Sequence, residues 1–438
     1  MSLFRADQSL TNSSYYATTA PRDPHFSPLD GSVECDVAIV GGGLAGLSAA
    51  IELADRGFKV VLLEARSVAY GASGRNGGQA LAGLACEQSV IEEQLGCSDS
   101  RTVWNMTVEA IELIHERCRR FGIDCDWRAG YLSLAVNARK GRELAQWHER
   151  MHRVYGFEGT AIEPRELPRW IASRRFHSGV HDPCSGHLHP LKYSLGLARA
   201  AASLGVRLFE NSAVTALTPG PSARLATANG DVTARHVLLA GNVYLQGIAP
   251  LLEKRIMPVG TYIVTSKPLA PAVAEALIPS RSAVCDTNFV LDYFRTTPDH
   301  RLLYGGRVSY STRTPRNLGQ SMKARMLRTF PQLGGTQIEY AWGGFVDISM
   351  NRAPDFGRLS DIGGGHERAN VYYLQGFSGH GLALTGLAGK LVAEAIGGNA
   401  QRLDIFSRIR HRAFPGGRLL RTPALVLGMA YYRLRDAL

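Results

Sequence analysis

Residues Asp36–Glu64 constrain the fold of this chain more than any other segment. An apolar run at 37–40 is followed by the glycine pattern GGGLAG, and a helical pattern then leads to a second apolar run at 60–63. A strand, a glycine-rich turn, a helix and a second strand in this order are typical of a unit that binds a dinucleotide. The segment therefore predicts a Rossmann-like domain.

Each residue of the glycine pattern has a physical role in such a site. Gly41 permits the tight turn, Gly43 lets the backbone approach a pyrophosphate, and Gly46 lets the helix pack closely on the strand. The helix then points its N-terminal N–H groups at the phosphates. Glu64 ends the second strand, where an acidic side chain accepts hydrogen bonds from a ribose diol. The pattern by itself is compatible with both NAD and FAD.

The length and composition are those of a globular protein with two or more domains. The chain has 438 residues, of which 45% are hydrophobic and 20% are charged. Its seven cysteines form no CxxC pair, which favours reduced thiols over a disulfide framework or a zinc site. His187 and His189 lack a nearby set of carboxylates or cysteines, and Pro190 is expected to start a helix. We therefore expect no metal site.

The positive charge is concentrated near the C-terminus. The formal net charge is +11, and eight arginines stand against two aspartates between Arg402 and Leu438. Within 414–438, arginines flank apolar residues, as in a segment that lies on an anionic membrane surface. Packing of this tail on its own domain or on a second subunit is the alternative. No repeated pattern of basic and aromatic residues accompanies the charge, so we expect no nucleic-acid partner.

Periodicity places helices and strands along the rest of the chain. Apolar residues at helical spacing predict helices at 100–120, 138–155, 191–204, 320–329 and 382–396. Alternation predicts strands at 131–136, at 371–374, and repeatedly within 255–350, where we expect an antiparallel sheet. The nucleotide-binding unit is therefore expected to be completed by downstream segments, and the second sheet to form a roof over a substrate pocket.

Three segments together carry a resemblance to a known family. They are the Asp36–Glu64 unit, the loop GASGRNGGQ at 71–79, and the late GFSGHGLALT at 376–385. With these segments the chain resembles the D-amino-acid-oxidase-like FAD-dependent oxidoreductases over almost its entire length. The resemblance implies the fold class α/β (α+β), with a Rossmann-like FAD-binding domain interleaved with an antiparallel-sheet substrate domain.

The resemblance also implies a set of FAD-binding residues. The first motif is expected to bind the ADP half of FAD, with Glu64 on the adenosine ribose, and the loop at 73–79 is expected to run beside the flavin. The full expected set is Gly41, Gly43, Leu44, Ala45, Gly46, Glu64, Ala65, Ser73, Gly74, Arg75, Asn76, Gly77, Gly78, Gln79, Val214, Gly241, Gly376, Ser378, Gly379, His380, Gly381 and Leu382.

The loop at 376–381 has a physical rationale of its own. Glycines before a helix let backbone N–H groups and the positive end of the helix dipole face a developing negative charge, such as that of reduced flavin. His380 lies inside this loop, where it either packs and hydrogen-bonds or transfers a proton. Relatives with covalent flavin use a cysteine near the segment that corresponds to 342–344. This chain has none there, so we expect non-covalent FAD.

The expected domains are interleaved along the chain. They are a lead-in at 1–34, an FAD-binding domain from 35–85, 185–250 and 350–400, a substrate domain from 86–184 and 251–349, and a basic apolar C-terminal segment at 401–438.

Substrate recognition is expected in the second sheet. Similar glycine oxidases fix a carboxylate with an arginine at the position of Val346, so the usual clamp is missing here. Arg307 and Arg352 are the candidate replacements, and with His380 and Trp342 they form the expected catalytic set. Aromatic residues that suit either a pocket wall or a sheet core are Tyr131, Phe289, Tyr293 and Trp342.

The resemblance implies an FAD-dependent amine oxidase or dehydrogenase that transfers hydride to flavin N5 and leaves an imine to hydrolyse. The expected substrate is γ-glutamylputrescine or a related polyamine derivative; the alternative is a secondary amino acid such as L-pipecolate, bound by Arg307. The electron acceptor is O2 or a membrane chain. Because the N-terminus has no basic stretch before an apolar core, we expect a cytoplasmic protein, peripheral on the inner face of the cytoplasmic membrane if 414–438 is an anchor.

Overall fold

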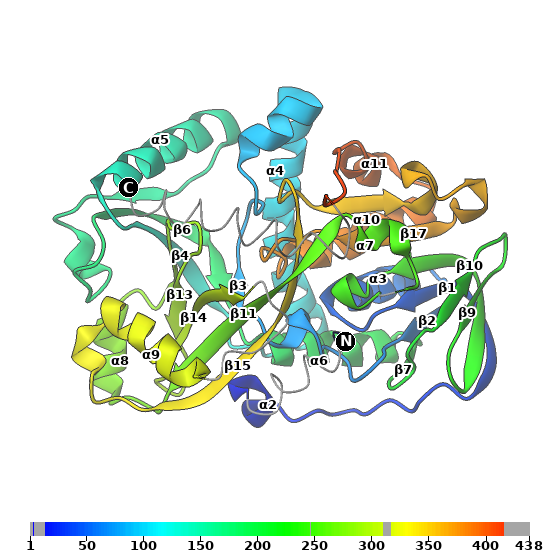
Figure 1. Ribbon diagram of the computed structural model, residues 1–438, viewed down its shortest axis with the longest axis horizontal. Coiled ribbons are helices and arrows are strands. Elements are labelled where there is room, and N and C mark those ends of the chain that lie inside the picture. The colour runs from blue at the N-terminus through cyan, green and yellow to red at the C-terminus, as the bar shows by residue number, and fades with distance from the viewer. Residues whose placement is uncertain (1–2, 4–13, 246, 310–316, 416–438) are drawn as a thin grey trace.

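The computed structural model describes residue 3 and residues 14–245, 247–309 and 317–415, with the side chains of 307–309 left out. Two sheets lie in the two halves of the molecule, and a long helix rises between them (Figure 1). The fold is therefore mixed α/β, as the sequence predicts. Within the described ranges, no helix is long and apolar enough to cross a membrane.

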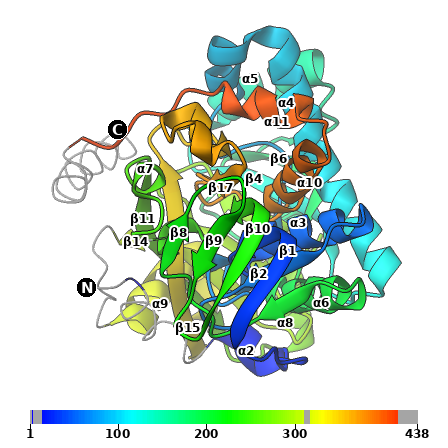
Figure 2. The same ribbon diagram turned by 90° about the vertical axis from the view of Figure 1, so that its right-hand side faces the viewer.

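The first sheet contains the predicted nucleotide-binding unit. Its strand order is β16 (Asp355–Arg358), β17 (Val371–Gln375), β10 (Gly230–Leu239), β1 (Gly31–Val40), β2 (Val60–Leu63) and β7 (Arg207–Phe209), with β9 (Ala223–Ala226) and β8 (Ala216–Thr218) attached beyond β10. Pairing is parallel from β17 to β7 and antiparallel between β16 and β17. Figure 2 shows β9, β10, β1 and β2 side by side.

Apolar helices cover this sheet, and small residues allow close packing between them. The helices of this half are α3 (Leu44–Asp55), α6 (Pro190–Ser203), α10 (Leu384–Ile396) and α11 (Gln401–Ser407). At the contact of α10 with α3, a Cβ added to Gly389 would lie 2.5 Å from the backbone nitrogen of Ala49. A larger residue at 389 would therefore push the two helices apart.

The second sheet is mainly antiparallel. Its order is β15 (Ile338–Ser349), β11 (Ile256–Ser266), β14 (Leu302–Ser309), β13 (Tyr293–Thr296), β12 (Ala283–Asp286), β4 (Arg128–Ala135), β6 (Ser178–His187) and β3 (Gln79–Ala80), with β5 (Thr160–Ile162) on β6. Pairing within 256–349 is antiparallel, as predicted, and β12 also pairs in parallel with β4, which lies outside that range. The two strands come from segments about 150 residues apart, so no hairpin joins them.

The remaining helices surround the second sheet and the region between the two halves. They are α2 (Tyr15–Thr19), α4 (Gln88–Phe121), α5 (Ala138–Tyr155), α7 (Pro250–Glu253), α8 (Pro271–Leu277) and α9 (Leu318–Thr329). The helix predicted at 100–120 extends further toward the N-terminus as α4, which has non-helical backbone angles at Gly96. The interruption hides the first turns from a periodicity search.

The strands of each sheet come from separate stretches of sequence. The first sheet draws on 31–63, 207–239 and 355–375, whereas the second draws on 128–187 and 256–349 together with the short β3. We therefore propose that the FAD-binding domain and the substrate domain are interleaved along the chain, and that β3 belongs to the substrate domain.

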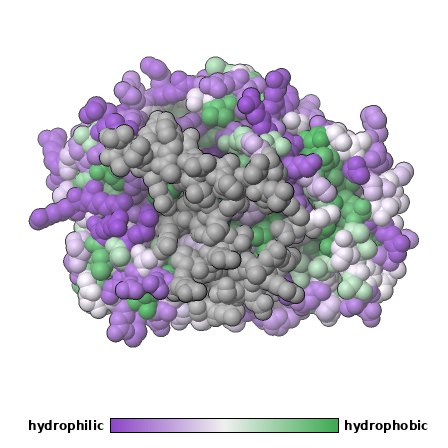
Figure 3. Space-filling model, viewed as in Figure 1, coloured by the Kyte–Doolittle hydropathy of each residue, from purple (hydrophilic) through white to green (hydrophobic). Residues whose placement is uncertain are grey.

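The visible surface in Figure 3 is mostly hydrophilic, with separate hydrophobic areas. Among the described residues, the exposed large hydrophobic side chains are Val273, Leu291 and Met350. The segment at 416–438, which carries most of the proposed membrane anchor, lies outside the described residues.

Candidate functional site

The β1–α3 turn has the geometry that its glycines predict. Gly41 has φ +115°, and a Cβ there would lie 2.7 Å from the carbonyl oxygen of Ala240. A Cβ on Gly46 would lie 2.0 Å from the carbonyl oxygen of Gly41. The turn therefore depends on glycine at both positions, and it directs the start of α3 into a large cavity.

Glu64 lies beside this turn at the end of β2. Its Oε2 accepts a hydrogen bond from the backbone N–H of Gly42 at 2.7 Å, and its Oε1 accepts one from Arg66 at 2.9 Å. Burial raises the pKa of the Glu64 carboxyl, and the two N–H groups oppose that shift. Each carboxylate oxygen retains capacity for a second donor, such as a ribose hydroxyl.

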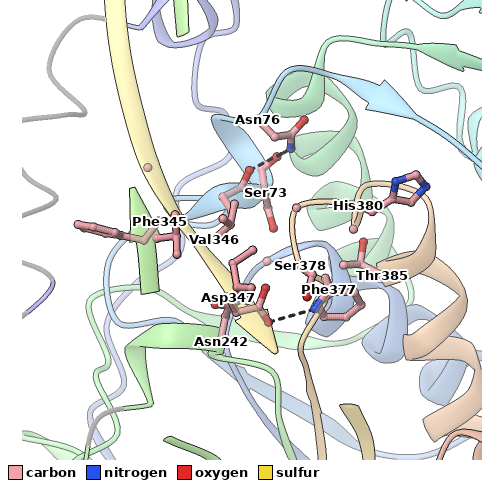
Figure 4. Close-up of a pocket in the computed structure, with 18 of the residues that line it drawn as sticks. Ser73, Asn76, Asn242, Phe345, Val346, Asp347, Phe377, Ser378, His380 and Thr385 are labelled. Carbon is pink, nitrogen blue, oxygen red and sulfur yellow. Dashed lines mark hydrogen bonds between the residues drawn. The ribbon is translucent and has the colours of Figure 1, made fainter. Parts of the chain in front are cut away.

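The loop at 73–79 is held by its own side chains. The Ser73 Oγ accepts a hydrogen bond from the backbone N–H of Leu44 at 2.9 Å, which ties the loop to the start of α3. The Asn76 amide donates to the carbonyl oxygens of Ala72 and Ser73 and accepts from Gly78, as Figure 4 shows for Ser73. The loop is thus fixed against the cavity before any ligand binds.

Arg75 and Trp342 connect this loop to the second sheet. Arg75 is buried, and its guanidinium donates to the carbonyl oxygens of Gly343 at 3.1 Å and Gly71 at 3.3 Å. The Trp342 indole Nε1–H donates to the carbonyl oxygen of Arg75 at 2.9 Å. Both side chains have structural partners here, and Trp342 is fully buried and does not line the cavity. The expectation that Trp342 belongs to the catalytic set is therefore wrong, because its side chain does not reach the cavity.

The loop at 376–382 is anchored by a residue that sequence reasoning missed. The Asp347 carboxylate accepts hydrogen bonds from the backbone N–H groups of Gly376 at 2.5 Å and Phe377 at 3.3 Å. Figure 4 shows the bond from Phe377. The Asp347 carbonyl oxygen accepts from Ser378 at 2.9 Å. Burial raises the pKa of Asp347 to about 6. The alternation of β15 predicts which residues share a face, but not that this face meets a distant glycine loop.

His380 lies in the same loop and lines the cavity. Its Nε2 is 3.2 Å from the carbonyl oxygen of Ala82, which accepts a hydrogen bond if Nε2 carries the proton. Burial lowers the pKa of His380 below its usual value. The ring is therefore neutral near pH 7 and holds the loop against the segment before α4.

A single cavity of about 880 Å³ brings most of the predicted residues together. The predicted residues on its wall are Gly41, Gly43, Leu44, Ala45, Glu64, Ala65, Ser73, Arg75, Asn76, Gly77, Gln79, Val214, Gly241, Ser378, Gly379, His380, Gly381, Leu382 and Arg352. Behind the wall lie Gly46, Gly74, Gly78 and Gly376, where backbone packing rather than ligand contact explains the glycine. The side chain of Arg307 lies outside the described residues, so its predicted role stays a prediction.

The second sheet supplies the other side of the cavity. Tyr131, Phe289 and Tyr293 line it, so three of the four aromatic residues that suited either a pocket wall or a sheet core contribute to the wall. The Cys285 thiol, which sequence reasoning missed, also lines the cavity and donates to Gln79 Oε1 at 3.0 Å. Burial raises the pKa of Cys285 to about 12. The thiol is therefore protonated and a poor nucleophile at neutral pH.

The two histidines considered as metal ligands have other partners. His187 Nε2 lies 2.9 Å from the carbonyl oxygen of Arg281. His189 caps α6, where its Nδ1 accepts from the backbone N–H of Lys192, and its Nε2 lies 3.0 Å from Thr19 Oγ1. No cluster of three or more potential metal ligands was found among the residues that the structure describes.

The residues of the cavity fit an FAD molecule. The wall is continuous from Glu64, past the start of α3, to the loops at 73–79 and 376–382. Gly43 precedes α3 without a side-chain cap, and a Cβ there would lie 2.8 Å from Ser73 Oγ, in the space where a pyrophosphate approaches the helix N-terminus. An elongated dinucleotide with an anionic pyrophosphate near its middle suits this arrangement.

Comparisons with known proteins agree with this fit. The family model described as FAD dependent oxidoreductase matches residues 36–395. The gamma-glutamylputrescine oxidoreductase of Escherichia coli is 43% identical, over 97% of this chain and 98% of that protein. The probable oxidoreductase OrdL of Haemophilus influenzae is 38% identical, over 97% of each chain.

Solved structures show the same fold. Glycine oxidase from Geobacillus kaustophilus has a TM-score of 0.72 at 23% identity and covers 87% of this chain and 100% of its own. The L-proline dehydrogenase from P. horikoshii has a TM-score of 0.70 at 20% identity, over 87% of this chain and 98% of its own. Because the family model spans most of the sequence and two relatives share more than a third of their residues with it, the chain belongs to the family of FAD-dependent oxidoreductases.

Proposed function

We propose that this enzyme oxidises the C–N bond of an amine, with γ-glutamylputrescine or a related polyamine derivative as its substrate. The observation that carries the proposal is the 43% identity to gamma-glutamylputrescine oxidoreductase over nearly the whole of both chains. A match of this extent includes the cavity-forming strands of both sheets, not only the nucleotide-binding unit.

The cavity residues would hold FAD along its length. Glu64 would bind the adenosine ribose, Val214 would contact adenine through its backbone, and the start of α3 would face the pyrophosphate. The loops at 73–79 and 376–382 would flank the ring system. Bound FAD supplies an acceptor for two electrons, and the N-terminal end of α10 favours the added negative charge.

The oxidation requires the amine, bound FAD as the acceptor of two electrons, and water. The carbon next to nitrogen loses hydrogen with its electron pair, and the amine loses a proton, which leaves a C=N double bond. Water then adds to this imine and releases ammonia and an aldehyde. The protein has to admit the neutral amine, aim its C–H bond and exclude bulk water. The aromatic wall of Tyr131 and Tyr293 suits the last two tasks.

We propose that FAD is held without a covalent bond. Among the described cysteines, Cys285 lines the cavity, but burial raises its pKa and keeps it as a thiol. Acid precipitation should therefore release all flavin into the supernatant. Flavin that stays with the pellet, and is lost from it in Cys285→Ser, would contradict this point.

A substrate panel tests the proposal. Purified enzyme is mixed without oxygen with γ-glutamylputrescine, putrescine or L-pipecolate, and loss of the flavin's visible absorbance is followed. We expect fast bleaching with γ-glutamylputrescine. Fast bleaching with L-pipecolate, abolished in Arg307→Gly, would instead support the imino acid alternative. Readmission of air would restore the absorbance if O2 is the acceptor.

Membrane association is a separate proposal that rests on the basic, apolar sequence of 414–438. Pelleting with anionic vesicles, compared with a chain that lacks residues 414–438, tests it. Equal pelleting of the two proteins would rule out an anchor in this segment.

A further inference from the structure

The cavity opens to solvent between two loops of the second sheet. Leu291 lies in the β12–β13 connection, and Met350 lies in the turn after β15. Both line the cavity, yet they are 39% and 43% exposed, which is unusual for large apolar side chains in this structure. Because the wall reaches the solvent here, we call 289–291 and 350–352 the mouth of the cavity, and we call the buried part of its wall, at Arg75, its inner end.

An arginine and an aromatic ring meet at this mouth. The Arg352 guanidinium lies over the ring of Phe289, 4.5 Å from its centroid, and both residues line the cavity. Arginine can lie on an aromatic face and bind a carboxylate through two N–H groups at the same time. Arg352 is half-buried, so such a bond would be only partly screened by water.

The backbone that carries Arg352 is held in an unusual conformation. Arg352 has φ +59°, a region that non-glycine residues keep only where their surroundings fix it. The Asn351 side chain provides that fixation, since it accepts from the backbone N–H of Ala353 at 3.2 Å and donates to the carbonyl oxygen of Arg410 at 3.1 Å. The backbone N–H of Arg352 donates to Ser349 at 3.1 Å. The turn is thus rigid at the position of the arginine.

The loop that carries Phe289 is fixed from its two ends. Arg175 forms ion pairs with Asp286 at 2.9 Å and with Asp292 at 2.8 Å, and Arg325 forms a second pair with Asp292 at 2.7 Å. Both aspartates are almost fully buried. Phe289 therefore stands on a short loop whose ends cannot move apart without breaking a buried network.

We propose that Arg352, supported by Phe289, is a binding site for a carboxylate that the substrate carries at the end remote from the oxidised amine. The inference rests on the proposed function and deepens it. A long substrate with its amine at the inner end would place its opposite end at the mouth, where Arg352 lies. A small imino acid carries its carboxylate next to the reacting carbon and would not reach the mouth.

Two substrates separate this role from a structural one. γ-Glutamylputrescine has the remote carboxylate, whereas N-acetylputrescine has the same amide-linked amine without it. In Arg352→Met we expect kcat/KM for γ-glutamylputrescine to fall about 10- to 100-fold relative to kcat/KM for N-acetylputrescine, mainly through KM, as for loss of a charge-assisted hydrogen bond. Arg352→Lys should recover part of this loss. Arg410→Met is the matched control, because its side chain is exposed and only its carbonyl contacts the turn.

A ligand that cannot be oxidised keeps the test independent of the proposed function. The N-propyl amide of glutamate at its γ-carboxyl has the remote carboxylate but no reacting amine, and calorimetry measures its binding to holoenzyme. Weaker binding in Arg352→Met than in wild type and Arg410→Met would support the site even if neither amine is oxidised. Equal kinetic losses for both substrates, or unchanged binding of the amide, would overturn the proposal. If wild-type enzyme oxidises neither amine, the proposed function fails, and the binding result alone decides about Arg352.

Discussion

Trp342 and Arg75 are joined across the two halves of the molecule: the indole Nε1–H of Trp342, on β15, donates to the carbonyl oxygen of Arg75 at 2.9 Å. The Arg75 guanidinium in turn donates to the carbonyl oxygen of Gly343, next to Trp342 in the same strand. These two bonds fix the loop at 73–79, which we propose to lie beside the flavin, to the second sheet. The rigidity of the site therefore depends on a residue that does not line the cavity.

Trp342→Phe should weaken the protein and its hold on FAD together. The substitution leaves the buried carbonyl oxygen of Arg75 without its donor, at a cost of about 1–3 kcal/mol in the free energy of unfolding. Urea unfolding and the FAD dissociation constant measure the two effects. Trp170→Phe is the control, because Trp170 contacts His181 rather than the cavity. Unchanged FAD affinity in Trp342→Phe would show that the loop does not need this bond.

Asp347→Asn should change the way stability depends on pH. Burial raises the pKa of Asp347 from 3.8 to about 6, so the folded protein keeps a proton that the unfolded chain has lost between these values. Stability from Asp347 is fully present below pH 3.8 and is lost as the pH rises through about 6. The asparagine has no such loss, so its stability relative to wild type should rise by up to about 3 kcal/mol from pH 4 to pH 7.

Urea unfolding of the FAD-loaded proteins at several pH values measures that difference. An asparagine amide oxygen can still accept from Gly376 and Phe377, so the loop is expected to keep its place. A constant difference between the two proteins over this range would mean that Asp347 is ionised in the folded protein throughout.

His380→Gln tests whether His380 transfers protons. Burial lowers the pKa of His380 below 6.5, so the ring is neutral above that pH and no change in its charge shapes the rate there. We expect the pH profile of kcat between pH 6.5 and about 9 to keep its shape in the variant, with a reduced amplitude at most. Loss of one limb of the profile would identify His380 as the acid or base.

The same shift predicts an effect on stability. Because the folded protein disfavours the charged ring, the wild type should lose stability relative to His380→Gln as the pH falls below 6.5. If the wild type instead gained stability relative to His380→Gln as the pH falls below 6.5, folding would favour the protonated ring. Thermal unfolding of both proteins at matched FAD concentration gives this comparison.

The parts of the fold that could be predicted are those set by local pattern. The helix predicted at 138–155 has these limits as α5, and the glycine turn at Gly41 has the expected backbone. The parallel pairing of β12 with β4 was not predicted, because it joins segments far apart in the sequence. Local periodicity carries no information about such a neighbour.

Local sequence pattern likewise predicts only part of the candidate site. Gly43 and Glu64 lie on the cavity wall because their positions follow from one βαβ unit. Asp347 and Cys285 were missed, since each gains its place through a contact between segments that are far apart in the sequence. Trp342 was expected at the reacting centre and instead lies in the core, where an aromatic residue in an alternating strand is equally well accommodated.

The most direct test of the proposed amine oxidation is a single-turnover experiment on the purified holoenzyme. γ-Glutamylputrescine, either unlabelled or carrying deuterium at the carbon next to its primary amine, is mixed with the enzyme in the absence of oxygen, and reduction of the flavin is followed. We expect full reduction at a rate that is several-fold lower for the deuterated amine, because breaking of that C–H bond delivers the electrons. Flavin that stays oxidised with this amine would contradict the proposed amine oxidation.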